Sequence, residues 1–280
     1  MRWPTLPTLW GSIRKPEALK QLKAALDPLI NREIDNLRIP IDAAAAFEPS
    51  QIGTIVGTLT DAVLPHIALK TGIGLTKASG ILGDREGYPD FVHRSGYRIE
   101  LKGLFKDNPA VKLKKPPTRR EPSARLTQKV TTKNVRETQD ALLILVYQLD
   151  QTASDKNILS PRIVDLEVFP VIDCILARDH RLTSRGGRWF GDFETPTVLS
   201  NAGKRKLANG TKLNLATYGR KESEGHDFNE DTNFGKLKRI PYQPLQEFLA
   251  KNGTSFAGKG DYPKPWRISP QYQGVADDDD

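Results

Sequence analysis

Two acids and a lysine lie close together in residues 87–103, which read GYPDFVHRSGYRIELKG. The alternation of apolar side chains and the glycine-ended turn around Ser95 predict a β-hairpin. In a hairpin centred on Ser95 the numbers of paired residues sum to 190, so Asp90 faces Glu100. The sequence therefore predicts two carboxylates opposite each other on neighbouring strands.

Opposed carboxylates repel, since directly paired side chains have β-carbons about 5 Å apart. A divalent cation held between Asp90 and Glu100 would offset that repulsion. Lys102 shares a strand face with Glu100, because side chains alternate between the two faces. Two acids on a metal beside an ammonium group suit phosphodiester hydrolysis: the metal acidifies a water, and the lysine orients or deprotonates it or stabilises the transition state. The alternative is an exposed hairpin whose Glu100 pairs with Lys102 or Arg98.

Pro89-Asp90, nine intervening residues and Glu100-Leu101-Lys102 resemble the signature of the PD-(D/E)xK nucleases, best known from type II restriction endonucleases. The chain has a single acid-x-lysine triplet and a single Pro-Asp pair, and both fall on this hairpin. The resemblance implies that Asp90 and Glu100 are catalytic metal ligands, that the carbonyl of Leu101 is a further ligand, and that Lys102 is the catalytic lysine. It implies Mg²⁺ as the cofactor.

The same resemblance implies the fold class. It is α/β (α+β), with a restriction-endonuclease-like core of helix, three-stranded meander, helix and strand, in which helices flank a mixed central β-sheet. Many members recruit another acid from the helix before the meander, and Glu48, Asp61 and Glu86 are candidates here. An ordinary acid near a helix start and a solvated helix residue are the alternatives for Glu48 and Asp61.

Hydrophobic periodicity gives the expected elements. Helical spacing predicts helices over 16–37, from Ser50 to about residue 70 and over 123–138, the last capped by Ser123. Pro28 and Pro65 are expected to bend or divide the first two helices. Beyond the hairpin strands, 88–93 and 97–105, the continuous apolar run 141–149 predicts a strand buried on both faces, and 162–169 predicts a further strand.

The chain carries 42 Lys and Arg against 34 Asp and Glu, a net charge of +8 that favours a polyanionic partner. Basic residues concentrate after the hairpin, and on the expected helix over 123–138 they form one stripe. We expect this stripe and the preceding loop to contact a DNA backbone, while a solvated helix face is the alternative. The expected DNA-binding residues are Lys114, Lys115, Arg119, Arg120, Arg125, Lys129 and Lys133.

Other features exclude several classes of protein. Cys174 is the one cysteine, so an intrachain disulfide is impossible, and its apolar surroundings predict a buried thiol. The four histidines share no metal-ligand spacing, and His93 is expected to be an exposed neighbour of the turn. The N-terminus lacks the apolar core of a signal peptide, and the run 141–149 is too short to span a bilayer as a helix. We expect a cytoplasmic protein without a membrane partner.

The expected function is that of a type II restriction endonuclease, which hydrolyses double-stranded DNA at a specific sequence with Mg²⁺ and leaves 5′-phosphate ends. The expected organisation is an N-terminal helical segment over 1–49, a nuclease core over 50–150, and DNA-recognition and dimerisation elements over 151–280. The family implies a homodimer and a cognate DNA methyltransferase in the same system. The alternatives are a structure-directed nuclease of the same superfamily, such as a resolvase or repair enzyme, and a non-catalytic basic protein that binds nucleic acid.

Overall fold

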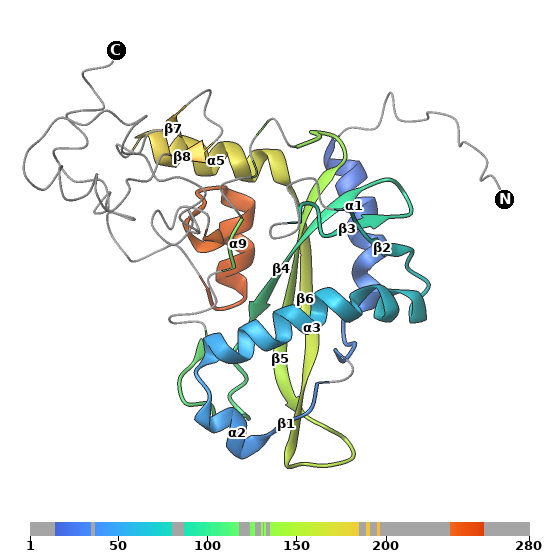
Figure 1. The fold of residues 1–280 in the computed structure, drawn as a ribbon, viewed down its shortest axis with the longest axis vertical. Helices are drawn as coiled ribbons and strands as arrows, with labels where there is room; N and C mark the ends of the chain where they lie inside the picture. Colours follow the sequence, from blue (N-terminus) through green and yellow to red (C-terminus); the bar gives the residue numbers. More distant parts are fainter. Residues whose placement is uncertain are drawn as a thin grey trace, which may run out of the picture.

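A computed structural model provides the fold (Figure 1). It describes residues 15–34, 37–79, 87–117, 124–126, 130, 132, 135–184, 189–190, 195–196 and 236–254.

A mixed six-stranded sheet is the centre of the molecule, with strand order β1-β6-β5-β4-β3-β2. Strands β4 and β5 are parallel, and the other neighbours are antiparallel. The expectation of a mixed α/β fold with helices against a central sheet is confirmed. The strands are β1 (Ile39–Pro40), β2 (Leu75–Lys77), β3 (Phe91–His93), β4 (Arg98–Phe105), β5 (Asp140–Gln151) and β6 (Ile158–Pro170), with a separate pair β7 (Trp189–Phe190) and β8 (Thr195–Pro196).

The predicted hairpin is present, in the predicted register. Phe91 pairs with Ile99 and Val92 with Arg98, so the paired numbers sum to 190. Gly96 closes the turn with φ of +89°, a left-handed conformation that glycine adopts without the steric cost of a side chain. Strand β2 pairs with β3 on its other side, which completes a three-stranded antiparallel meander.

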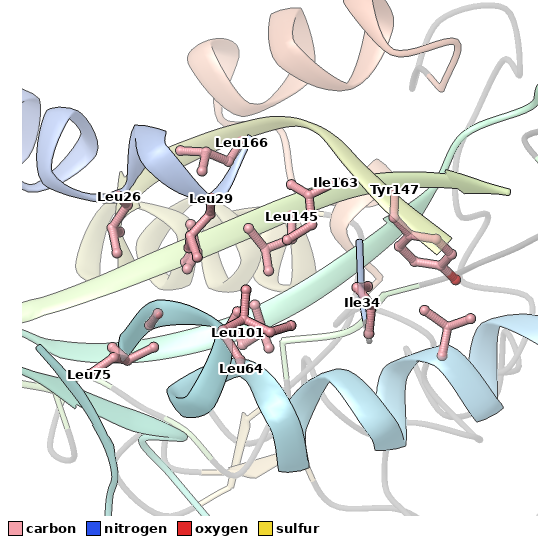
Figure 2. Close-up of a cluster of buried hydrophobic side chains, with 14 of the residues drawn as sticks. Leu26, Leu29, Ile34, Leu64, Leu75, Leu101, Leu145, Tyr147, Ile163 and Leu166 are labelled. Carbon is pink, nitrogen blue, oxygen red and sulfur yellow. The ribbon is translucent and has the colours of Figure 1, made fainter. Parts of the chain in front are cut away.

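The apolar run 141–149 is the buried strand that its composition predicts. Odd-numbered side chains such as Leu145 join one hydrophobic cluster, and even-numbered ones such as Ile144 join a second cluster on the opposite face. Helices α1 (Lys15–Leu26) and α3 (Pro49–Lys70) pack in the first cluster, part of which Figure 2 shows. Helices α5 (Val171–Ser184) and α9 (Gln243–Lys251) pack in the second.

Helix α3 crosses the long strands of the sheet (Figure 1) and carries part of the cavity described below. It begins one residue before the predicted Ser50, since the side chain of Glu48 caps it in a capping box with Gln51. It continues through Pro65, so the expected break there is wrong. By length and composition alone it is also the one described helix that could cross a membrane, a test that buried core helices pass as well.

The N-terminal helix is shorter than predicted, and two short helical elements were not predicted. Helix α1 ends at Leu26, and the expected continuation to residue 37 is replaced by a short 3-10 turn, η1 (Asp27–Leu29), that contains Pro28. The short helix α2 (Ile41–Ala46) precedes α3, and η3 (Leu237–Arg239) precedes α9.

The prediction of a helix over 123–138 is wrong for the described part of that segment. Arg125 forms an extended bridge with Lys236, and the backbone N–H of Leu237 donates to the carbonyl of Ala124 at 2.8 Å. None of the described residues among 124–126, 130, 132 and 135–138 is helical. Leu126 and Val130 are fully buried in the second cluster, so pairing with a distant segment and burial outweighed the helical spacing of the basic residues.

Candidate active site

Strand β4 positions Glu100 and Lys102 because its two faces have different neighbours. Ile99 and Leu101 join the cluster under α1 and α3, so Glu100 and Lys102 lie on the opposite face of the strand. Asp90 immediately precedes β3, and its Oδ2 accepts a hydrogen bond from the backbone N–H of Leu101 at 2.7 Å. The hairpin therefore brings together the three side chains that the sequence singled out.

Glu100 is a buried acid whose carboxylate is only half satisfied. Its side chain is 4% exposed, and Oε1 accepts a hydrogen bond from Nζ of Lys102 at 2.6 Å. Its other oxygen, Oε2, is buried and has no hydrogen-bond partner among the described residues. Burial is the main cause that raises the pKa of Glu100; Lys102 opposes the rise and the charge of Asp90 adds to it, which leaves the pKa at about 7. Glu100 does pair with Lys102, but the expected alternative of an exposed pair is wrong.

The pKa of Asp90 is shifted in the same direction as that of Glu100. Burial raises the pKa of its carboxyl above the usual range, whereas Lys102 and the Leu101 N–H favour the charged form. Its Oδ2 accepts from the N–H of Leu101, the residue after Glu100, so Asp90 lies beside the strand that carries Glu100.

Both acids influence the pKa of Lys102. Desolvation lowers its pKa, but the charges of Glu100 and Asp90 outweigh that effect and raise the pKa above its usual value. Lys102 therefore carries a positive charge at neutral pH.

A buried network supports the hairpin, and sequence reasoning did not foresee it. Asp140, at the start of β5, accepts hydrogen bonds from Nε and Nη2 of Arg98 at 2.7 Å each. It also accepts from the hydroxyl of Tyr88 and from the backbone N–H of Arg136. Because Arg98 and Asp140 are direct partners in the β4–β5 register, the network ties the hairpin to the central strand. The sequence did carry one sign of this network: an acid, Asp140, directly precedes a fully apolar run.

A cavity of about 400 Å³ opens at the acids and runs beside α3. Asp90, Lys102 and Asp61 line it, and Asp61 forms an ion pair with Lys77. The charge of Asp61 contributes to the raised pKa values of Asp90, Glu100 and Lys102. Of Glu48 and Asp61, the two further acids in the described part of the chain, Asp61 is the one that lines the cavity.

The other two further acids have different places. Glu48 forms ion pairs with Lys114 and Lys115, at 2.9 and 3.1 Å, which lower the pKa of its carboxyl. Glu86 lies outside the described residues.

The donor set at the hairpin fits one hard divalent cation. The unpartnered Oε2 of Glu100, the carboxylate of Asp90 and the carbonyl of Leu101 are oxygen donors of the kind that Mg²⁺ prefers. Within the described part of the chain, no three His, Cys, Asp or Glu side chains form a cluster able to hold a metal ion. A cation here would therefore be bound by few protein ligands and would keep several waters, as Mg²⁺ commonly does.

The predicted DNA-binding residues fall in three groups. Lys114 and Lys115 are bound to Glu48 at the start of α3, and Arg125 lines the cavity. Arg119, Arg120, Lys129 and Lys133 lie outside the described residues, so the basic stripe is not assembled by the described part of the structure.

Two residues outside the site were assigned from the sequence. His93 is 4% exposed, so the expectation of an exposed turn neighbour is wrong. Its Nδ1 lies 2.6 Å from Oγ of Ser95, and burial lowers its pKa. Cys174 is fully buried, as predicted, and burial raises the pKa of its thiol.

The chain matches no protein-family model, no curated protein and no solved structure. Arguments about its function therefore depend on the geometry and electrostatics of the site.

Proposed function

We propose that the protein is a metal-dependent nuclease of the PD-(D/E)xK type, acting as a type II restriction endonuclease on double-stranded DNA. The observation that carries the proposal is the buried carboxylate of Glu100, with one oxygen on Lys102 and the other without a partner, next to Asp90. A purely structural ion pair would be expected to satisfy both oxygens, since an unsatisfied buried oxygen is costly.

The order of elements supports the same proposal. Helix α3, the meander β2-β3-β4 and the parallel strand β5 follow one another as that superfamily's core requires. The described residues among 124–126, 130, 132 and 135–138 are not helical, so the helix that the core places between the meander and β5 is not part of this support.

Each residue has a role that follows from its surroundings. Asp90, Glu100 and the Leu101 carbonyl would hold Mg²⁺, which when bound would acidify a water and neutralise charge on the phosphate. Lys102 is more strongly protonated than a free lysine, so it would stabilise negative charge on the phosphate instead of removing a proton from water. Asp61 is near enough to tune the acids through its charge.

Digestion of long duplex DNA with and without Mg²⁺ tests the proposal, with Asp90→Ala as the control. Discrete fragments that disappear with EDTA and with the variant are expected. Smearing or nicking would favour a structure-directed nuclease of the same superfamily. Absence of cleavage with intact binding would leave a non-catalytic protein that binds nucleic acid.

A further inference from the structure

One wall of the cavity beside the acids consists of small residues on a single face of α3. Ser50, Gly53, Gly57 and Asp61 follow one another at helical spacing and all line it, so this wall is about 16 Å long. Gly57 is exposed, and a β-carbon added there would meet no atom within 4 Å. The cavity is therefore open along this wall, and a larger side chain at position 57 would enter it.

Tyr147 forms the opposite wall and offers an unused polar group. Its side chain is 3% exposed and lines the cavity, and among the described residues its hydroxyl makes no hydrogen bond. Its ring stacks on Phe105 with centroids 5.1 Å apart, which fixes its position. Figure 2 shows Tyr147, Leu145 and Ile34 on the side of the sheet that α3 covers. A hydroxyl group that lines the cavity and bonds to no described residue is available to a ligand that enters the cavity.

The tyrosine ring lies beside Gly103, the residue that directly follows Lys102. A β-carbon at position 103 would lie 3.4 Å from the ring, which is van der Waals contact. Tyr147, Gly103 and Lys102 therefore line the same part of the cavity. A ligand whose charged group meets Lys102 would extend its adjoining part towards Tyr147.

The size and chemistry of the cavity fit one nucleotide of a strand. About 400 Å³ lies within the usual range for small-ligand sites. A duplex is too large for it, since its major groove alone is about 12 Å wide. Apolar side chains of Leu101 and Leu145, the aromatic Tyr147 and the hydroxyl groups on α3 together provide the mixed surface that a nucleobase and its sugar require.

We propose that this cavity binds a single unpaired nucleotide next to the phosphate that is cut. The nucleotide comes either from single-stranded DNA or from a duplex in which one base has left the stack. The inference rests on the proposed nuclease function and adds the form of its substrate: at least one nucleotide beside the scissile bond is unpaired when bound.

Binding measurements with three probes test the inference, with Ca²⁺ in place of Mg²⁺. The probes are a fluorescein-labelled oligothymidylate, a duplex with one unpaired thymidine, and a fully paired duplex of equal length, measured by fluorescence anisotropy. Both probes with unpaired nucleotides are expected to bind more tightly than the paired duplex. Preference for the bulged duplex over the oligothymidylate would identify a base extruded from a duplex, in agreement with the proposed substrate. The reverse would identify single-stranded DNA as the source and would contradict double-stranded DNA as the substrate of the proposed nuclease.

Two variants probe the cavity itself. Gly57→Leu fills the open space and is expected to weaken binding of the unpaired probes about tenfold, and Tyr147→Phe about threefold. Both should remain folded, since leucine is a better helix former than glycine and the Tyr147 hydroxyl makes no internal bond that would be lost. Thr58→Leu is the matched control, because Thr58 is exposed on α3 and does not line the cavity; it should bind as the unmodified protein does.

Two results would overturn the inference even if Mg²⁺-dependent cleavage is present. One is that Gly57→Leu binds the unpaired probes as tightly as the unmodified protein does. The other is that the unmodified protein binds paired and unpaired DNA equally well. Conversely, if the preference and the Gly57→Leu effect are found but no Asp90-dependent cleavage is detected, the nucleotide site stands and the nuclease function fails.

Discussion

Lys102 and Glu100 form a buried ion pair, with Nζ 2.6 Å from Oε1, while Oε2 of the same carboxylate has no partner in the part of the chain that the structure describes. The pair lies on the hairpin arm opposite Asp90, on the strand face that Leu104 of the second hydrophobic cluster shares. The arrangement leaves a carboxylate oxygen unused beside an ammonium group that the ion pair holds in place.

We expect Asp90→Asn and Lys102→Met to abolish Mg²⁺-dependent cleavage while leaving a folded protein that binds DNA. The asparagine can still accept the Leu101 N–H through its carbonyl oxygen, so the hairpin should keep its shape. Loss should be about a thousandfold or more, measured by single-turnover cleavage, because both changes remove charges that act on the transition state. Circular dichroism and anisotropy provide the controls. Full activity in either variant would show that the site has been assigned wrongly.

Glu100 gives the metal-free protein a particular pH dependence. Its pKa is about 7 in the folded state and 4.5 in the reference state, so the folded protein binds more protons between these values. This contribution to stability is complete below about pH 4.5 and is lost as the pH rises through 7, a change on the order of 3 kcal/mol. Glu100→Gln removes the titration. Urea denaturation in EDTA at several pH values measures the free energy of unfolding of both proteins. This free energy should fall less with rising pH in Glu100→Gln than in the unmodified protein, and an equal fall in the two would contradict the assignment.

Mg²⁺ should stabilise the protein only where both acids are intact. At pH 8, where Glu100 is ionised, a concentration of Mg²⁺ 100 times its Kd should add about 2.7 kcal/mol to the free energy of unfolding. At pH 6 the gain should be smaller, because binding must then displace a proton. Differential scanning fluorimetry with Mg²⁺ and with EDTA measures this. An equal shift of Tm in Glu100→Gln would place the cation elsewhere.

The network around Asp140 is expected to stabilise the fold without taking part in chemistry. Asp140→Asn leaves the Arg98 guanidinium, 10% exposed, without its carboxylate, which should cost about 3–5 kcal/mol of the free energy of unfolding. Tyr88→Phe removes one hydrogen bond of the network and should cost about 1 kcal/mol. Chemical denaturation compares them. If Asp140→Asn unfolds with unchanged stability, the network does not hold the hairpin.

The ion pairs of Glu48 should weaken contact with DNA, since Lys114 and Lys115 neutralise an acid as well as phosphates. We expect Glu48→Gln to tighten DNA binding at low salt. Neutralising Lys114 and Lys115 together should reduce the slope of log K against log salt by about 2. Neutralising Lys129 and Lys133 provides the comparison for the predicted basic stripe. Whichever pair leaves the slope unchanged is not on the path of the DNA.

Local patterns were enough for the hairpin and the central strand. The glycine-ended turn fixed the register, because a hairpin of that length pairs its strands in one way, and the register in turn placed Asp90 against Glu100. The continuous apolar run had to become a strand covered on both faces, since either face left exposed would cost hydrophobic burial.

Tertiary contacts decided the rest. Arg125 left its predicted helix because Lys236, more than a hundred residues later, pairs with its backbone and Leu126 gains full burial. Asp61, Glu48 and Glu86 could not be ranked from the sequence, since only the packing of α3 against the hairpin brings one of them to the acids. The sequence alone thus determined which residues could do chemistry, because turn geometry and side-chain alternation are local. Burial of Glu100, the unpartnered oxygen and the cavity beside α3 depend on which distant segments exclude water, and only the tertiary structure decided them.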